Sequence, residues 1–452
     1  MTTGTVSVPT AAPSLRRKIF SLAWPVILNN LLLTFVWIAD MIMVGRLGSA
    51  AVAAVGVSGQ MFNMVMALTL AVTTGTIALV ARHIGAQEKE RADAVLGHSL
   101  LLSTVFAAVV TVPTFVGSAS LFRLFGADPV VTAVGVPYLR VVVSGTLFLV
   151  VALVFAAALR GAGDTKTPLF VSVGANVVNV ILNYGLIFGK LGMPELGVLG
   201  AGIASIIAFT LEAAAFVYLS LTGKLMLSLP RKLLVMERDL MARILRIGSP
   251  SAVEHGLIQL GYLWYMTIIT GYGTGPLAAY MIGVNIMSLS FMPGFGFSVA
   301  ASALVGQSLG AKEPSAAASQ GWECTRLAVW VMAAIGIILF VAAKPTALIY
   351  VNEAGVVDYT ALFVRVLALC QPAMAIHFAL SGALIGAADT RWPLYSSFIG
   401  MFLIRLPLAF LAAHVLGLSI TWVWLIILAD HYIKAFVLFL RFLSGRWKSV
   451  KV

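Results

Sequence analysis

The residues of this sequence that could do chemistry are polar side chains inside long apolar stretches. Asp40 lies in the segment WIADMIMVG, 16 residues after Trp24, so a helix would place it about 24 Å further along its axis than Trp24. A charged side chain costs about 2.5–3.5 kcal/mol at the centre of a membrane-spanning helix. Because a buried carboxyl group can hold a proton or bind a cation, we expect Asp40 to take part in function.

Amide and hydroxyl groups are expected at the same depth as Asp40. Asn176, Asn179 and Asn183 are spaced three and four residues apart, so they share one face of a helix. Ser205 should lie at a similar depth in the next helix. We expect these residues to surround Asp40 in a cation-coupling site, with Asp40, Asn179 and Asn183 as the oxygen ligands if the ion is sodium. The alternative is a hydrogen-bonded network that only ties the helices together.

A second group of candidates lies in the other half of the chain. Glu254 and His377 should each lie about 12–13 Å from the same membrane face, where an acid and an imidazole could form a second protonation or substrate site. Gln259 and Tyr265 follow Glu254 on the same expected helix and are further candidates. A static buried pair, or two groups wetted near that face, explains Glu254 and His377 equally well.

Three more charged residues are expected inside helices near the C-terminus. Asp430 and Lys434 have the i,i+4 spacing at which opposite charges pair along a helix, and Arg405 could join them. We interpret these three residues as a structural ion network.

The composition requires a lipid environment for most of the chain. Of 452 residues, 60% are hydrophobic and 10% are charged, whereas soluble domains carry about 25% charged residues. Twelve apolar stretches reach the length of about 20 residues that a membrane span needs. The first stretch, from Ile19, is too long for a signal peptide, and Cys324 and Cys370 suggest no disulfide framework. We therefore predict an all-α membrane protein of twelve helices.

The net charge of +12 is explained by topology rather than by nucleic acid. Twenty of the 29 Lys and Arg residues fall in the termini and the loops on one side of the predicted spans. The loops on the other side carry Arg46, Arg123, Lys190 and Lys344. Positive residues stay in the cytoplasm, so both termini are predicted to be cytoplasmic.

The chain repeats itself at an offset of 225 residues. Segment 159–169 reads LRGAGDTKTPL and segment 384–394 reads LIGAADTRWPL, and 84–88 matches 309–313 at the same offset. Six spans per half give two bundles related by a pseudo-two-fold along the membrane normal. The predicted units are a flexible N-terminus (1–15), a first lobe (16–222), a linker (223–242), a second lobe (243–443) and a tail (444–452).

The duplicated GAxDT loops, the segment WIADMIMVGRLG and the stretch 288–311 together resemble the multidrug and toxic compound extrusion (MATE) family, closest to its DinF-like bacterial branch. The resemblance implies a cation-coupled antiporter that exports drugs and organic cations. It also implies that Asp40 is the coupling carboxylate, with Asn179, Asn183 and Ser205 around it, and that Glu254 matches the acid of span 7 in this branch.

Two departures from the family pattern concern acidic residues. Asn183 stands where many relatives have a second acid in span 5, and Met374 stands where another branch has an acid in span 10. A single first-lobe carboxylate has less charge to balance a sodium ion, which favours protons as the coupling ion.

We therefore predict a drug/proton or drug/sodium antiporter that works as a monomer by alternating access. No nucleotide-binding or catalytic motif was found, so neither an enzyme activity nor a cofactor beyond the coupling ion is expected. Pro293 predicts a bent span 8, and Pro25 and Pro250 should bend or begin spans 1 and 7. One alternative is a flippase for lipid-linked oligosaccharides, which would need a cavity rich in Arg and Lys. Another is a channel or scaffold that transports nothing.

Overall fold

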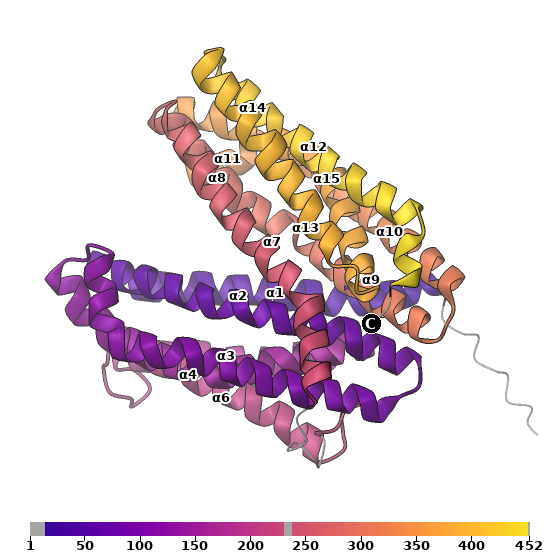
Figure 1. The fold of residues 1–452 in the computed structure, drawn as a ribbon. Helices are drawn as coiled ribbons and strands as arrows, with labels where there is room; N and C mark the ends of the chain where they lie inside the picture. Colours follow the sequence, from indigo (N-terminus) through magenta and orange to yellow (C-terminus); the bar gives the residue numbers. More distant parts are fainter. Residues whose placement is uncertain (1–13, 230–236, 451–452) are drawn as a thin grey trace, which may run out of the picture.

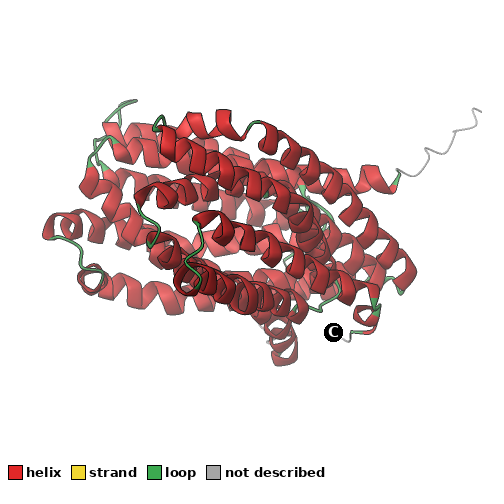
Figure 2. Ribbon diagram, turned by 90° about the horizontal axis from the view of Figure 1, so that it is seen from above, coloured by secondary structure: helices red, strands yellow, loops and turns green. Residues whose placement is uncertain are grey.

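The computed structural model describes residues 14–229 and 237–450 and is helical throughout this part of the chain (Figure 2). Eleven of its helical segments are long and apolar enough to cross a membrane. Helix α7 is more polar but has a similar length, and it completes the twelve predicted spans. The first six spans are α1 (Leu15–Gly45), α2 (Ser49–Gly85), α3 (Lys89–Leu124), α4 (Pro129–Ala162), α5 (Lys166–Phe188) and α6 (Val198–Leu221).

The other six spans include two that are interrupted. Span 8 is broken at Phe291, just before Pro293, as the sequence predicted. Span 11 contains two π-helical segments, η1 and η2. The elements are α7 (Arg238–Thr270), α8 (Thr274–Ser290), α9 (Met292–Gly310), α10 (Pro314–Val341), α11 (Ala343–Tyr350), α12 (Ala354–Gly386), α13 (Arg391–Phe398), η1 (Ile399–Arg405), α14 (Leu406–Phe410), η2 (Leu411–Val415), α15 (Ile420–Leu443) and the 3₁₀ turn η3 (Arg446–Ser449).

The helices form two lobes that meet at one end of the molecule and diverge toward the other (Figure 1). We call the meeting end the basal end; its loops join α2 to α3, α4 to α5, α9 to α10 and α12 to α13. The start of α1 and the turn η3 also lie at this end. Both chain ends are therefore on one side, as twelve spans require.

The 225-residue repeat extends to the backbone angles of the loops. At four pairs of equivalent positions both residues have positive φ. Two of these pairs are glycine in both halves and two are not, so the repeat preserves the turn even where it does not preserve the residue. The pairs are Gly48 and Gly273 (106° and 94°), Gly192 and Gly417 (76° and 59°), Gln87 and Lys312 (62° and 60°), and Gly163 and Ala388 (92° and 60°).

Helices α1 and α7 each cross from one lobe to the other. The first turns of α1 bury Ile19 and Leu22 in the hydrophobic core of the second lobe. The first turns of α7 bury Leu240 and Ile244 in the core of the first lobe. Nearer its other end each helix packs into its own lobe, so both helices run through their proline rather than begin there.

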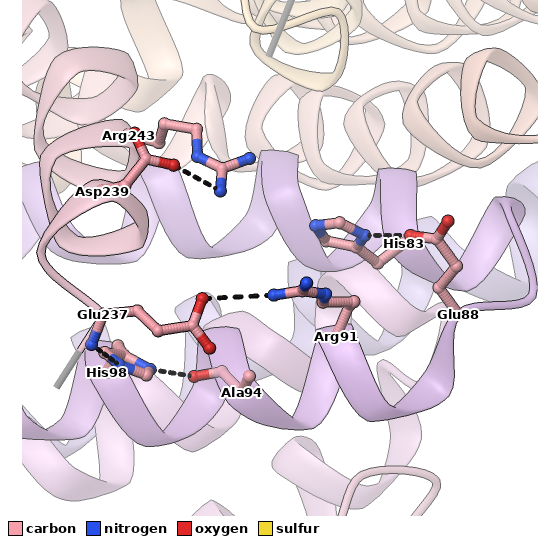
Figure 3. A network of polar contacts seen from close by, with 8 residues as sticks. All are labelled: His83, Glu88, Arg91, Ala94, His98, Glu237, Asp239 and Arg243. Carbon is pink, nitrogen blue, oxygen red and sulfur yellow. Dashed lines mark hydrogen bonds and ion pairs between the residues drawn. The ribbon is translucent and has the colours of Figure 1, made fainter. Parts of the chain in front are cut away.

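The start of α7 is fastened to the first lobe by polar contacts (Figure 3). The Nε2 atom of His98 accepts the backbone N–H of Glu237 at 3.0 Å. The Nδ1 atom therefore carries the proton and donates to the carbonyl of Ala94 at 2.8 Å. Arg91 pairs with the carboxylate of Glu237 at 3.1 Å. These contacts hold the beginning of the second half of the chain against α3.

The predicted unit boundaries differ from the observed elements at three points. Helix α7 begins at Arg238, inside the predicted linker 223–242, because its first turns have packing partners in α2 and α3. Helix α1 begins at Leu15, and residues 446–449 of the predicted tail form η3, whose Trp447 is buried against Phe442. Residues 1–13, 230–236 and 451–452 lie outside the described part of the chain.

Backbone contact between α7 and α2 should make Gly248 sensitive to a single methyl group. A Cβ atom at Gly248 would lie 1.5 Å from the carbonyl oxygen of Ala71, whereas one at Gly256, two turns further along α7, would meet nothing within 4 Å. We expect Gly248→Ala to lower the free energy of unfolding by about 1–3 kcal/mol through overpacking. Gly256→Ala, the matched control, should leave it equal or slightly higher. Thermal unfolding in detergent measures both, and equal melting temperatures would contradict this packing.

Candidate ion-coupling site

Asp40 is joined to span 5 by a short side-chain hydrogen bond. The Nδ2 atom of Asn183 donates to Oδ1 of Asp40 at 2.6 Å and to Oδ1 of Asn179 at 3.1 Å. Asp40 comes from the last turns of α1, and the two amides come from one face of α5, as their spacing predicted. The structure therefore brings together the three residues that were expected to be the oxygen ligands.

The site has one unused acceptor. Asn183 is completely buried, and its Oδ1 atom has no hydrogen-bond partner. Asp40 is only partly buried, so its carboxylate lies at the edge of the buried amides. A buried acceptor without a donor costs about 1–3 kcal/mol. A protonated Asp40, or a cation held by Asp40, could satisfy this oxygen after a rotation of the amide.

Two predicted members of the site make no hydrogen bond to Asp40, Asn179 or Asn183. Asn176 donates from Nδ2 to the carbonyl and hydroxyl oxygens of Ser172, one turn earlier in α5. The hydroxyl of Ser205 donates to the carbonyl of Ala201 in its own helix at 2.9 Å. Both side chains thus satisfy their hydrogen bonds locally, which short polar side chains in helices commonly do.

The second-lobe candidates do not form the expected acid–imidazole pair. The carboxylate of Glu254 accepts the hydroxyl of Ser397 at 2.6 Å. The Nδ1 atom of His377 is buried without a hydrogen-bond partner. Gln259 is exposed. Tyr265 is fully buried and donates its hydroxyl to the carbonyl of Val423 at 2.9 Å, which makes it a packing residue rather than a substrate contact.

Arg405, Asp430 and Lys434 form the network that their spacing suggested. Asp430 is completely buried; it pairs with Nη2 of Arg405 and with Nζ of Lys434, the latter at 2.9 Å. The two cationic partners compensate the charge of the buried Asp430 carboxylate, so Asp430 is held in its ionised form in one position. The geometry of this cluster fits a structural role. Asp40 differs, because it is only partly buried and has no cationic partner among its hydrogen bonds in the described part of the chain.

Sequence reasoning missed several residues around this network. His431 lies 3.2 Å from Nη2 of Arg405 through its Nε2 atom, and the guanidinium lies over the rings of Tyr262 and Tyr265. Gly400 is needed because a Cβ atom there would lie 2.1 Å from Oδ1 of Asp430. The adjacency of His431 to Asp430 was a usable signal, but nothing in the sequence indicated Tyr262 or Gly400.

Comparison with known proteins places the chain in a family. The MatE family model matches twice, over residues 25–185 and 250–411. The two matches begin 225 residues apart, at Pro25 and Pro250, and together cover most of the chain. This chain belongs to the MATE family. It is accordingly a multi-pass membrane protein of a transporter family, with the two-lobe architecture that the repeat predicted.

Full-length relatives and solved structures agree with this assignment. The chain is 31% identical over 440 residues to a probable multidrug resistance protein NorM of Thermotoga maritima, covering 97% of this chain and 94% of the relative. It is 27% identical to the uncharacterized transporter YisQ of Bacillus subtilis, covering 95% and 94%. These relatives confirm the MATE family; they do not test the expected DinF-like branch.

The fold matches solved MATE structures along almost the whole chain. A transporter of the MOP superfamily from Pyrococcus furiosus superposes with a TM-score of 0.88 at 22% identity, covering 97% of both chains. An outward-facing multidrug resistance MATE transporter also gives 0.88 at 22% identity, covering 96% and 97%.

The buried network predicts a large difference between two aspartates that each pair with a lysine. Asp430→Asn would leave Arg405 and Lys434 buried with too little negative charge, so we expect the free energy of unfolding to fall by about 3–5 kcal/mol. The control is Asp358→Asn, because Asp358 pairs with Lys344 at 3.5 Å on the surface; its change should stay within about 1 kcal/mol. Thermal unfolding and yield of folded protein report the difference, and a stable Asp430→Asn protein would contradict the role given to the network.

Proposed function

We propose that this protein is a secondary active multidrug exporter that exchanges organic, mostly cationic amphipathic compounds for protons by alternating access. The observation that carries the proposal is the hydrogen-bonded cluster of Asp40, Asn179 and Asn183 at one edge of the first lobe. Its support from relatives is the name multidrug resistance protein, which several full-length homologues bear.

Asp40 suits ion coupling because its charge state controls a contact between two helices. When ionised, its carboxylate accepts the amide N–H of Asn183 and so ties α1 to α5. A proton on the carboxyl group weakens this charge-assisted bond, since such bonds are stronger than neutral ones. The outer part of α1 is then free to move relative to α5. Pro25 provides a place where α1 can bend, because proline removes one helix hydrogen bond.

The arrangement of the lobes suits alternating access. They contact each other through α1, α2, α7 and α9 at the basal end and diverge at the other end (Figure 1). The basal loops and both termini carry most of the Lys and Arg residues, so the basal end faces the cytoplasm in our proposal. In that orientation the structure is closed toward the cytoplasm, and substrate leaves on the opposite side. The working unit is a monomer in the bacterial inner membrane.

Protons are favoured over sodium as the coupling ion. The first-lobe cluster has one carboxylate, and the Oδ1 atom of Asn179 already accepts a hydrogen bond. A proton needs only the carboxyl group of Asp40, whereas a sodium ion needs several oxygen ligands and charge balance.

The rival functions have less support. A flippase for lipid-linked oligosaccharides would need free cationic groups for pyrophosphate. The deep cations Arg405 and Lys434 are instead paired with Asp430 inside the second lobe. A channel or scaffold gives no reason for two lobes that are packed together at one end and diverge at the other.

Replacement of Asp40 tests the coupling directly. Asp40→Asn removes the ionisable group but keeps a side chain of the same shape, so the protein should fold and insert normally. We expect efflux driven by an imposed pH gradient to fall to the level of protein-free vesicles, because no proton can be exchanged at this site. Dye efflux from proteoliposomes measures it, with pH and sodium gradients applied separately.

Asp358→Asn is the matched control for this experiment, because it removes a surface carboxylate at the start of α12. It should retain wild-type efflux. If Asp40→Asn exports dye at the rate of the control, Asp40 is not the coupling group.

The amide at position 183 should also set the choice of ion. Asn183→Asp would place a second carboxylate within hydrogen-bond distance of Asp40, and two such groups cannot both be ionised without a cation. We expect this variant to gain stimulation by an imposed sodium gradient that the wild type lacks. The same vesicle assay decides: sodium stimulation of the wild type, or none in the variant, would contradict this account of ion choice.

A further inference from the structure

Two side chains reach across the basal end from one lobe to the other. Nη2 of Arg82, in α2, donates to the carbonyl oxygen of Ala387 at 2.8 Å. Nε2 of Gln307, in α9, donates to the carbonyl oxygen of Gly161 at 3.0 Å. Arg82 and Gln307 are equivalent positions of the 225-residue repeat. The two bonds are therefore reciprocal, each lobe supplying one donor and one acceptor.

The two acceptors have the same structural character. Gly161 is in the last turn of α4, and Ala387 is the residue that follows α12. Carbonyl groups at helix C-termini lack partners within the helix and carry the negative end of the helix dipole. Both residues are buried, so without the donor from the other lobe these carbonyls would be buried and unsatisfied.

The backbones of α2 and α9 touch at the same place. A Cβ atom on Gly85 would lie 1.9 Å from the carbonyl oxygen of Gln307. A Cβ atom on Gly310 would lie 2.0 Å from the carbonyl oxygen of Arg82. Gly85 and Gly310 are again equivalent in the repeat. The backbone of each donor residue is thus held against a glycine of the opposite lobe. This contact fixes the position of the donor's Cα atom relative to its acceptor.

We propose that Arg82 and Gln307 form a reciprocal latch that holds the basal end closed and that must open in every transport cycle. They are positioning residues: they set the balance between the basal-closed and basal-open states without contacting the ion at Asp40. This inference rests on the proposed alternating access. It gives the duplicated GAxDT segments a role, because each presents the carbonyl that receives the donor from the other lobe.

The latch affects the equilibrium between the closed and open states because its acceptor carbonyls have different hydrogen-bond donors in the two states. In the closed state each carbonyl depends on the donor from the opposite lobe. When the lobes part at the basal end, water can reach the same carbonyl and replace the donor. Removing a donor therefore penalises only the closed state. The penalty is larger at Arg82, since a charged donor makes a stronger bond and also interacts with the helix dipole.

The equilibrium is measured with spin labels across the basal end. Glu90→Cys in α3 and Ser315→Cys in α10 are exposed, symmetry-equivalent sites on opposite lobes. The native Cys324 and Cys370 are buried and should not be labelled. Distance distributions in lipid nanodiscs then report closed and open basal ends as short and long distances. No transport activity is needed for this measurement.

Arg82→Met and Gln307→Met keep the length of each side chain and remove the donor. We expect the ratio of open to closed populations to rise about tenfold for Arg82→Met and about threefold for Gln307→Met. In the double variant the two increases should roughly multiply, because each lost bond removes its own contribution to the free energy of the closed state. The control is Arg365→Gln, an exposed arginine of α12 outside the basal contacts, which should leave the distribution unchanged.

An exchange of the two residues separates a latch from simple packing. Arg82→Gln combined with Gln307→Arg moves the charged donor to the other lobe. Because each of the two positions faces a carbonyl group in the GAxDT segment of the other lobe, this variant should return the distribution close to that of the wild type. If the methionine variants and their double keep the wild-type distribution, or if the exchange is as open as the double methionine variant, the latch is refuted.

Failure of the latch and failure of the proposed function give different results. If Asp40→Asn abolishes gradient-driven efflux while the latch variants leave the distances unchanged, coupling stands and the latch is wrong. If the latch variants shift the distances while Asp40→Asn exports normally, the latch stands and the coupling site is wrong.

Discussion

Backbone-to-backbone contact between helices of opposite lobes is the constraint on which the rest of this structure depends. At the basal end α2 meets both α7 and α9 at distances that leave no room for a side chain, and glycines occupy the contact points. Packing of this kind is specific, because one added methyl group forces the helices apart. It also makes the contact all-or-none. Lobes that touch through backbone atoms either fit or separate, and rigid-body movement about such an interface is a general route between two states.

A nearly symmetric scaffold carries an asymmetric distribution of charge. In the first lobe, Asp40 is partly buried and is held by one amide, so its environment tolerates a change of charge. In the second lobe, Asp430 is enclosed by Arg405, Lys434 and His431, so its charge is compensated and fixed. The repeat explains how the lobes fit together. In our proposal the ion chemistry lies where the repeat is broken, because a carboxyl group that changes its charge is needed only once per cycle.

Much of the architecture followed from sequence because it depends on local and repeated features. The offset of 225 predicted two equivalent halves, and the spacing of Asn179 and Asn183 predicted the face of α5 that meets Asp40. A hydrogen bond from Ser205 to the Asp40 cluster is not observed, because depth along a helix says nothing about rotation around its axis. The hydroxyl of Ser205 instead donates to the nearby carbonyl of Ala201. The bonds of Arg82 and Gln307 were equally hidden, because their partners are backbone carbonyls of distant segments, and any residue type supplies a carbonyl.

The crossing of α1 and α7 has a consequence for how the protein is made. The first turns of α1 are synthesised before any helix of the second half, yet the core that buries Ile19 and Leu22 is built largely from those helices. Until α9 has entered the bilayer, that end of α1 lacks the second-lobe residues that bury it, among them Phe297. The first half of the chain is thus not a self-contained folding unit. Its biogenesis has to keep an incompletely packed helix in the membrane until the rest of the polypeptide arrives, and a product truncated before α9 would expose that unpaired surface to quality control.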